Sequence, residues 1–429
     1  MSRSQQGNDS KSGVSYSVDG VMETSMNASR DLEFAIEWNR FILRIVGIWP
    51  DEESSKSTRR ELKFSFILAT FVLFSFFCLP QIISLVMVWG NLDLMIENLL
   101  TANVGIASLL ELIIAWYNGK VLKLLLTHVI EDWMMPKSEQ ERQMMLKNAR
   151  IARTLCIGCL FLIQATLITF ITARIIVIQN QVVENSTNFT RELICQSYFP
   201  YDTRNSPNFE LTCFGQCLAC FYITISYCGI DTFITMLVLH VCAQFTNLRY
   251  GLKNLVEMGS KNRMEFRKKL AIIVVKHERL NRFAESMEES FNHMFLIQIL
   301  SSTIQFCSQG YQVFAVLNSK EGQFSLYQLI FLIVFVTCIL SQLFIYCYAG
   351  EKLNVESSLV GYAAYECEWY NLSVPEARDL MFVMMRAREP LQITAGKFCS
   401  FSFSLFCDIL KTSLGYLSVL LTIKKQSEE

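Results

Sequence analysis

Few side chains in this chain are of the types that carry enzymatic or metal chemistry, and none has the spacing that such chemistry needs. Cysteine occurs twice at CxxC spacing, as Cys156/Cys159 and Cys217/Cys220. A structural zinc site needs four ligands, and each pair stands alone in an apolar run, so we interpret both as packing residues. The four histidines form no HExxH motif, and GxSxG, Walker A and GxGxxG are absent from the sequence. We therefore expect neither an enzyme nor a metal or cofactor site.

The last apolar segment, 398–423, holds ionisable side chains that need an explanation. Charged groups inside a membrane usually face a protein interior or a water-filled path. At 100° per residue, one helical face about 120° wide collects the polar residues, which are Asp408, Lys411, Thr412, Gly415, Ser418 and Thr422. Val419 lies within that face and Ile423 at its edge. Two interpretations stay open: a polar stripe that packs against its own bundle, with Asp408 and Lys411 paired, or a pore-lining helix in which Val419 and Ile423 form an apolar gate.

Seven apolar runs predict an all-α membrane protein with seven transmembrane helices. Each run approaches or exceeds the roughly 20 residues that cross a hydrocarbon core, and together they cover 64–89, 93–116, 153–178, 212–242, 291–317, 324–348 and 398–423. The chain of 429 residues is 52% apolar and 18% charged. A soluble protein with two cores would match that composition, so the distribution of apolar residues decides the class.

The segments outside the spans are predicted to be cytosolic tails and helices. Residues 1–31 are rich in Ser, Gly and Asn and contain no apolar signal-peptide core, so we expect a disordered cytosolic tail. Residues 32–50 place apolar and charged side chains on different helical faces, which is typical of an amphipathic surface or re-entrant helix. Helical periodicity continues through the cytosolic segments 243–290 and 349–397, and a short helix is expected between Pro375 and Pro390.

Basic residues predict a cytosolic amino terminus and an outer carboxyl terminus. Lys and Arg number five on one side of the membrane and 31 on the other, which comprises the tail to residue 63 and segments 117–153, 243–290 and 349–397.

Segment 179–211 is expected on the outer side. It carries two N-glycosylation acceptors, Asn185 and Asn188, which fit that orientation. Cys195 and Cys213 lie on the same side and are candidates for a disulfide.

Four stretches of the chain resemble insect odorant receptors. The run PLQITAGKFCSFSFSLFCDILKTSLGYLSVL at 390–420 is closely similar to the family's carboxyl-terminal signature. The stretches GEKLNVESSLVGYAAYECEWYNL at 350–372, HERLNRFAESMEESFNHMFLIQILSSTIQFC at 277–307 and WNRFILRIVGIWP at 38–50 are similar to further parts of the family. The resemblance covers about residues 32–425.

The resemblance implies an odour-gated, non-selective cation channel that assembles as a tetramer with a common co-receptor subunit. The last helix would line a central pore, with the gate at Val419 and Ile423 and an ion-selectivity position at Thr422. The cytosolic ends of the last four spans would anchor the subunits to one another. The co-receptor has a much longer loop between the fourth and fifth spans, so this chain resembles an odorant-specific tuning subunit. The implied location is the plasma membrane of olfactory neuron dendrites.

The resemblance further implies a ligand pocket for small volatile odorants in the outer halves of the second, third, fourth and sixth spans, within 64–348. By helical placement, the nominated residues are Met95, Asn98, Leu99, Gln164, Leu167, Ile171, Cys217, Phe221, Tyr327 and Phe331. The expected partners are the odorant, the co-receptor and the lipid bilayer, and no nucleic acid is expected.

Three alternatives are weaker. A G-protein-coupled receptor needs an outer amino terminus, and the DRY and NPxxY motifs are absent from the sequence. A gustatory receptor shares the expected fold, but its TYxxxxxQF signature is missing from the last span. A secondary transporter would be built from inverted repeats, and none is visible.

Overall fold

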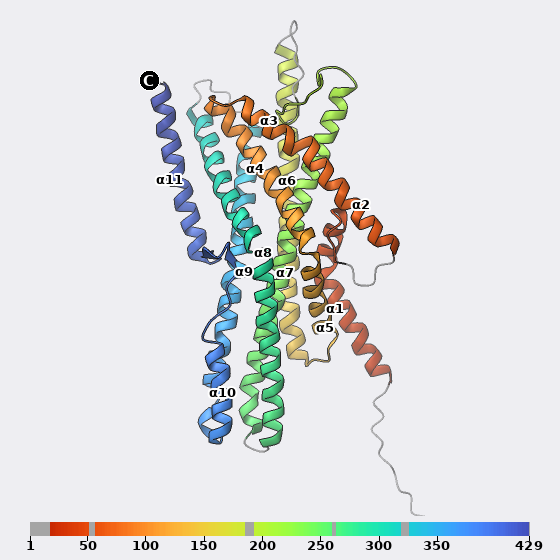
Figure 1. Ribbon diagram of the computed structural model, residues 1–429, viewed down its shortest axis with the longest axis vertical. Coiled ribbons are helices and arrows are strands. Elements are labelled where there is room, and N and C mark those ends of the chain that lie inside the picture. The colour runs from red at the N-terminus through yellow and green to blue at the C-terminus, as the bar shows by residue number, and fades with distance from the viewer. Residues whose placement is uncertain (1–17, 51–55, 185–192, 260–262, 319–325, 429) are drawn as a thin grey trace, which may run out of the picture.

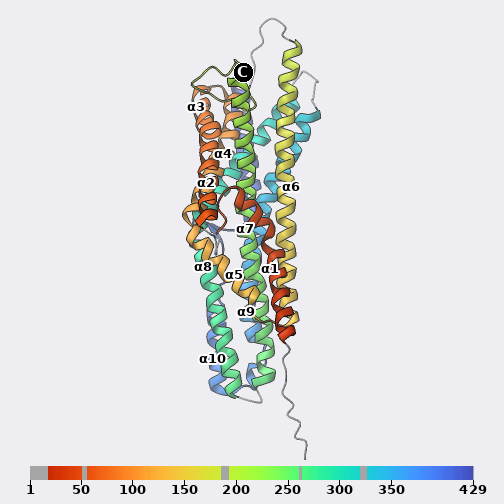
Figure 2. The same ribbon diagram turned by 90° about the vertical axis from the view of Figure 1, so that its right-hand side faces the viewer.

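The computed structural model describes residues 18–50, 56–184, 193–259, 263–318 and 326–428. Its long helices run side by side in an elongated bundle (Figures 1 and 2). The first half contains α1 (Val18–Ile45), α2 (Lys56–Leu73), a π-helical turn (Phe74–Cys78), α3 (Leu79–Met87), α4 (Leu92–Tyr117), α5 (Gly119–Met134) and α6 (Glu139–Glu184). The second half contains α7 (Asn208–Gly259), α8 (Arg263–Asn318), α9 (Leu326–Glu366), α10 (Val374–Arg386), the antiparallel pair β1 (Thr394–Ala395) and β2 (Cys399–Ser400), and α11 (Phe403–Glu428).

Each of the seven predicted spans corresponds to helical structure, but residues 398–402 of the last one precede α11 and include β2. The first corresponds to α2, the π-helical turn and α3, and the others correspond to α4, α6, α7, α8, α9 and α11. Among the described residues, five helical stretches are long and apolar enough to cross a membrane, within α2–α3, α4, α6, α7 and α9. The stretches in α8 and α11 fall outside that group, and both helices carry many amide and hydroxyl side chains.

α7 forms the centre of the bundle, and α11 lies at its edge (Figure 1). The most apolar stretch of α7 is entirely buried, with Phe233, Leu237 and Phe245 at most 1% exposed. It contacts α4, α6, α8 and α9, whereas the main contacts of α11 with the longer helices are to α8 and α9. A helix that is apolar on all sides is expected at such a central position.

α1 begins at Val18, so the disorder predicted for residues 1–31 is wrong for residues 18–31, which are helical. Residues 1–17 lie outside the described part of the chain. Ser, Asn and Asp lower helix propensity only modestly, and contacts with the rest of the bundle outweigh that preference here. Asp31 shows this directly, because its carboxylate binds the Arg142 guanidinium of α6 at 2.6 Å.

The remainder of α1 packs along the flank of the bundle against α5, α6 and α7 (Figure 2). Its buried face contains Ile36 and Leu43, at most 2% exposed, while Phe41 is 59% exposed. The predicted segment 32–50 is therefore amphipathic, but its buried face is rotated away from Phe41.

The cytosolic helices lie close to their predicted positions. α7 and α8 continue without a break through 243–259 and 263–290. α10 begins at Val374, where a capping box joins Ser373 and Glu376. Pro375 occupies its first turn, a position that needs no backbone N–H donor.

Gly105 of α4 allows the π-helical turn to approach closely. A Cβ at residue 105 would overlap the ring of Phe77, which is 4% exposed, whereas a Cβ at Gly158 of α6 would meet nothing within 4 Å. We expect Gly105→Ala to lower the free energy of unfolding by about 1 to 3 kcal/mol, because the buried ring must shift. Thermal unfolding in detergent, with Gly158→Ala as the control, measures the difference. Equal melting temperatures for the two variants would contradict this prediction.

Candidate functional site

A cavity of about 460 Å³ lies inside the bundle between α4, α6, α7 and α9. Phe77 of the π-helical turn and three residues of α8 complete its lining. The volume lies within the range of about 300 to 1,000 Å³ that is common for small-molecule sites. Most of its walls are apolar, including Leu100, Val104, Leu167, Phe170, Phe331 and Phe335.

Helical spacing explains which residues reach the cavity. Side chains three, four and seven residues apart share one face of a helix. α4 contributes Glu97, Leu100, Thr101 and Val104 in this spacing, and α7 contributes Cys220, Ile223, Thr224 and Tyr227. α6 follows the same rule over about one more turn, with Ile163, Thr166, Leu167, Phe170, Ala173 and Arg174.

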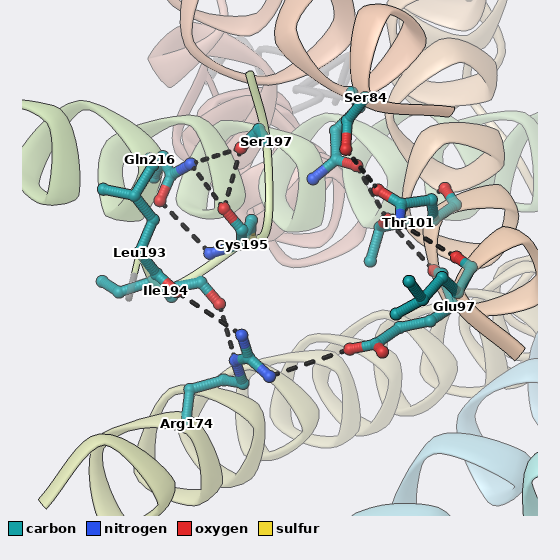
Figure 3. A network of polar contacts seen from close by, with 12 residues as sticks. Ser84, Glu97, Thr101, Arg174, Leu193, Ile194, Cys195, Ser197 and Gln216 are labelled. Atoms are coloured by element: carbon teal, nitrogen blue, oxygen red, sulfur yellow. Dashed lines mark hydrogen bonds and ion pairs between the residues drawn. The ribbon is translucent and has the colours of Figure 1, made fainter. Parts of the chain in front are cut away.

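An ion pair marks one end of the cavity. Arg174 of α6 and Glu97 of α4 point toward each other, with 3.7 Å between Arg174 Nη1 and Glu97 Oε1 (Figure 3). The Arg174 Nε also donates to the carbonyl oxygen of Ile194 at 2.9 Å. This end of the cavity therefore places one cation and one anion beside otherwise apolar walls.

A buried glutamine holds residues 193–197, the segment whose Ile194 carbonyl accepts the hydrogen bond from Arg174. Gln216 of α7 accepts from the Cys195 amide at 3.2 Å and donates to the Cys195 carbonyl at 3.0 Å. It also donates to Ser197 Oγ at 2.7 Å (Figure 3). Leu193 and Ile194 are 8% exposed, so this segment covers the bundle as a packed cap.

A buried carboxylate lies near the opposite end. Tyr227 and Gln342 line the cavity and border a second cavity of about 20 Å³, which Asp231 also lines. The Asp231 carboxylate accepts from Gln298 of α8 at 3.2 Å on each oxygen. Gln342 and Tyr346 of α9 donate to it as well. This cluster connects α7, α8 and α9 directly below the cavity.

The nominated ligand residues fall on several faces of their helices. Leu167 and Phe331 line the large cavity. Asn98 lines a third, small cavity that shares Glu97 and Arg174 with it. Six others are not part of the large cavity's lining: Met95, Leu99, Gln164, Ile171, Cys217 and Phe221. The side chain of Tyr327 lies outside the described part of the structure.

Helix phase separates the nominated residues that line the large cavity from those that do not. Gln164 is adjacent to the lining residue Ile163, but a step of one residue turns the side chain by 100°. Gln164 instead donates to Thr224 Oγ1 at 3.2 Å.

Sequence reasoning overlooked the ionisable residues at both ends of the cavity. Glu97, Arg174 and Asp231 each lie within a predicted span, as does Glu111 of α4. Glu111 is fully buried, and neither of its carboxylate oxygens has a hydrogen-bond partner among the described residues. The rule that intramembrane charges mark functional sites identified Asp408 and Lys411, and it would have identified these four as well.

The polar face of α11 points away from the bundle. Thr412, Gly415, Ser418 and Thr422 are exposed, while Ile409 and Ser413 on the other side are 6% and 5% exposed. The interpretation in which the polar stripe packs against its own bundle is therefore wrong, because the opposite face makes those contacts.

The ionisable pair of α11 is also exposed. Asp408 and Lys411 lie 3.9 Å apart within the helix, with side chains 62% and 78% exposed. Val419 is 55% exposed, and the side chain of Ile423 lies outside the described residues.

Four predicted positions remain, two asparagines and two cysteines. Asn185 and Asn188 are outside the described residues. Cys195 and Cys213 are both free, so the predicted disulfide is not formed in this structure.

Comparison with known proteins identifies the family. The model of the family described as 7tm Odorant receptor matches residues 91–414. Odorant receptor 13a of Drosophila melanogaster is 24% identical over 427 residues, which covers 90% of this chain and 95% of the relative. The odorant receptor coreceptor of Aedes aegypti is 28% identical over 167 residues, covering 39% of this chain and 34% of that protein.

The fold also matches a solved structure. The olfactory receptor OR5 from Machilis hrabei, in complex with eugenol, superposes with a TM-score of 0.77 at 16% identity, covering 94% of this chain and all of that one. This similarity confirms the predicted all-α, seven-span fold. The match to residues 91–414 covers most of the chain, so the protein belongs to the insect odorant receptor family and is a multi-pass membrane receptor of olfaction rather than an enzyme.

Proposed function

We propose that the chain is the odorant-binding subunit of a ligand-gated, non-selective cation channel. It works in a heterotetramer with the family co-receptor, in the plasma membrane of olfactory neuron dendrites. A small volatile molecule binds in the 460 Å³ cavity and shifts α11, which lines a central pore. Val419 and Ile423 form the gate near the outer end of that helix, and the polar residues from Asp408 to Thr422 line the conduit.

The exposed polar face of α11 is the observation that carries this proposal. A membrane helix that directs hydroxyl and charged side chains away from its own bundle needs water or other protein in front of them. Thr412, Ser418 and Thr422 meet that description. A pore shared with neighbouring subunits supplies the water.

Contacts between the cavity and α11 support a route for coupling. Tyr227 lines the cavity and donates a hydrogen bond to Gln298 of α8. Further along α8, Gly310 faces Leu417 of α11, and a Cβ at residue 310 would lie 2.8 Å from Leu417 Cδ2. A ligand that displaces Tyr227 therefore acts on the helix against which α11 packs.

One feature supports a tuning subunit that works with a co-receptor, and another supports a small volatile ligand. Only residues 260–262 separate α7 from α8, whereas the family co-receptor carries a long loop there. The complex of OR5 with eugenol supports a small volatile ligand for this fold, and eugenol is a suitable first probe.

Currents in excised patches test the proposal. We expect odour-evoked current when the chain and the co-receptor are expressed together, at most a weak response from the chain alone, and no need for guanine nucleotides. The co-receptor alone is the control, because its current must lack the odour preferences that this chain confers. A response that disappears without GTP would refute the channel and favour a G-protein-coupled mechanism.

A further inference from the structure

We propose that the Glu97–Arg174 pair selects ligands that carry a hydroxyl group, which bridges the two side chains inside the cavity. This inference rests on the proposed function and deepens it by naming the ligand class. The geometry of the pair, the fixed position of Arg174 and the mostly apolar remainder of the cavity each contribute to the argument.

The distance within the pair leaves room for a bridging atom. Arg174 Nη1 and Glu97 Oε1 are 3.7 Å apart, which is longer than a direct hydrogen bond. One oxygen atom can lie about 2.8 Å from both, as charge-assisted hydrogen bonds require. A hydroxyl oxygen suits this position because it accepts a hydrogen bond from the guanidinium and donates one to the carboxylate.

The arginine is fixed before a ligand arrives. Its Nε donates to the Ile194 carbonyl at 2.9 Å, and its Nη2 lies 3.5 Å from the Leu193 carbonyl. Those carbonyls belong to the cap that Gln216 holds through Cys195 (Figure 3). A site that is already ordered loses little conformational entropy when it binds a ligand.

Other polar groups fit the pair less well. A ligand carboxylate would be attracted by Arg174 but repelled by Glu97. A protonated amine would be attracted by Glu97 but repelled by Arg174. A ketone or ether accepts from the guanidinium but turns lone pairs toward the Glu97 carboxylate, which then loses a hydrogen bond. Sites built to bind a hydroxyl reject analogues that lack it, because their own polar groups are left unpaired.

The remainder of the cavity defines the body of the ligand. Leu100, Phe170 and Phe331 are among the apolar side chains that line it. The expected ligand is therefore a small aliphatic or aromatic alcohol, with an apolar body against these walls and its hydroxyl between Glu97 and Arg174.

Matched compounds test the inference in cells that express the chain with the co-receptor. The panel holds three skeletons (hexyl, octyl and 2-phenylethyl), each as the alcohol, its methyl ether, the primary amine and the carboxylic acid. We expect each active skeleton to be about tenfold more potent as the alcohol than as the ether, the size of one charge-assisted hydrogen bond. In Glu97→Met the ratio should fall to about threefold or less, because the alcohol loses its acceptor and the ether no longer faces an unpaired carboxylate.

Glu210→Met, at an exposed position in the first turn of α7, is the matched control and should keep the tenfold preference. If Glu97→Met fails to reach the surface, Glu97→Gln replaces it and should reduce the preference in the same direction. An ether as potent as its alcohol in the wild type, or an alcohol preference that survives both Glu97 variants, would refute the hydroxyl inference alone. No current from any compound, with both subunits at the surface, would refute the proposed function as well.

Discussion

Replacing Asp231 by Asn is expected to lower the free energy of unfolding by about 1 to 3 kcal/mol, the cost of leaving a buried hydrogen-bond donor without its partner. The Asp231 carboxylate is 5% exposed and accepts hydrogen bonds from Gln298, Gln342 and Tyr346. Asn keeps the shape of the side chain but offers a single acceptor oxygen. Its NH₂ group faces donors, so at least one buried donor loses its partner and is not compensated by water.

Thermal unfolding of the detergent-solubilised protein, together with surface expression, measures this effect. Asp202→Asn is the matched control, because Asp202 lies exposed in the outer loop and its replacement should change the free energy of unfolding by about 0.5 kcal/mol or less. Identical melting of the Asp231 and Asp202 variants would mean that the three donors do not depend on the carboxylate. The cluster would then be excluded as the element that joins α7 to α8 and α9.

The transmembrane architecture was predictable because the bilayer restricts the solutions. A lipid-exposed backbone must satisfy its hydrogen bonds within a helix, so runs of apolar residues of the right length specify where the spans lie. The distribution of Lys and Arg adds the orientation. Hydropathy and the count of basic residues are each taken over many residues. Single ionisable residues inside a span, such as Arg174 or Asp408, therefore do not change the prediction.

The lining of the cavity was not predictable in the same way, because it depends on the phase of each helix. The nominated Leu99 and the lining residue Leu100 are neighbours, yet only Leu100 faces the cavity. Both are apolar, so hydropathy does not distinguish a face toward lipid from one toward a cavity. The rotation of α4 is fixed by tertiary contacts, such as the hydrogen bond between Ser108 Oγ and Ser226 Oγ of α7 at 2.8 Å.

α11 shows both the strength and the limit of pattern analysis. Periodicity alone placed Asp408, Thr412 and Gly415 on one face. It left open whether that face meets the bundle, because a polar stripe is compatible with protein or with water in front of it. The opposite side decides the matter, because Ile409 is buried there and Leu417 packs against Gly310 of α8, which is distant in sequence.

Shortening Val419 and Ile423 to Ala together is expected to open the channel without odorant. An apolar constriction blocks ions by excluding water, and smaller side chains allow the passage to fill. We expect basal current roughly tenfold above wild type, which corresponds to a shift of about 1.4 kcal/mol in the gating equilibrium. Whole-cell current before odorant, blocked by a pore blocker of the co-receptor complex, measures it.

Leu414→Ala is the matched control for the gate. Leu414 is 66% exposed on the same helix but lies off the polar face, so its variant should gate like the wild type. If the double variant also gates like the wild type, α11 does not provide the gate and the pore assignment fails. We do not expect the ion pair of Asp408 and Lys411 to close the pore in place of the apolar side chains of Val419 and Ile423. At 3.9 Å and with both side chains more than half exposed, such a pair contributes little energy in water, which favours the proposed gate at Val419 and Ile423.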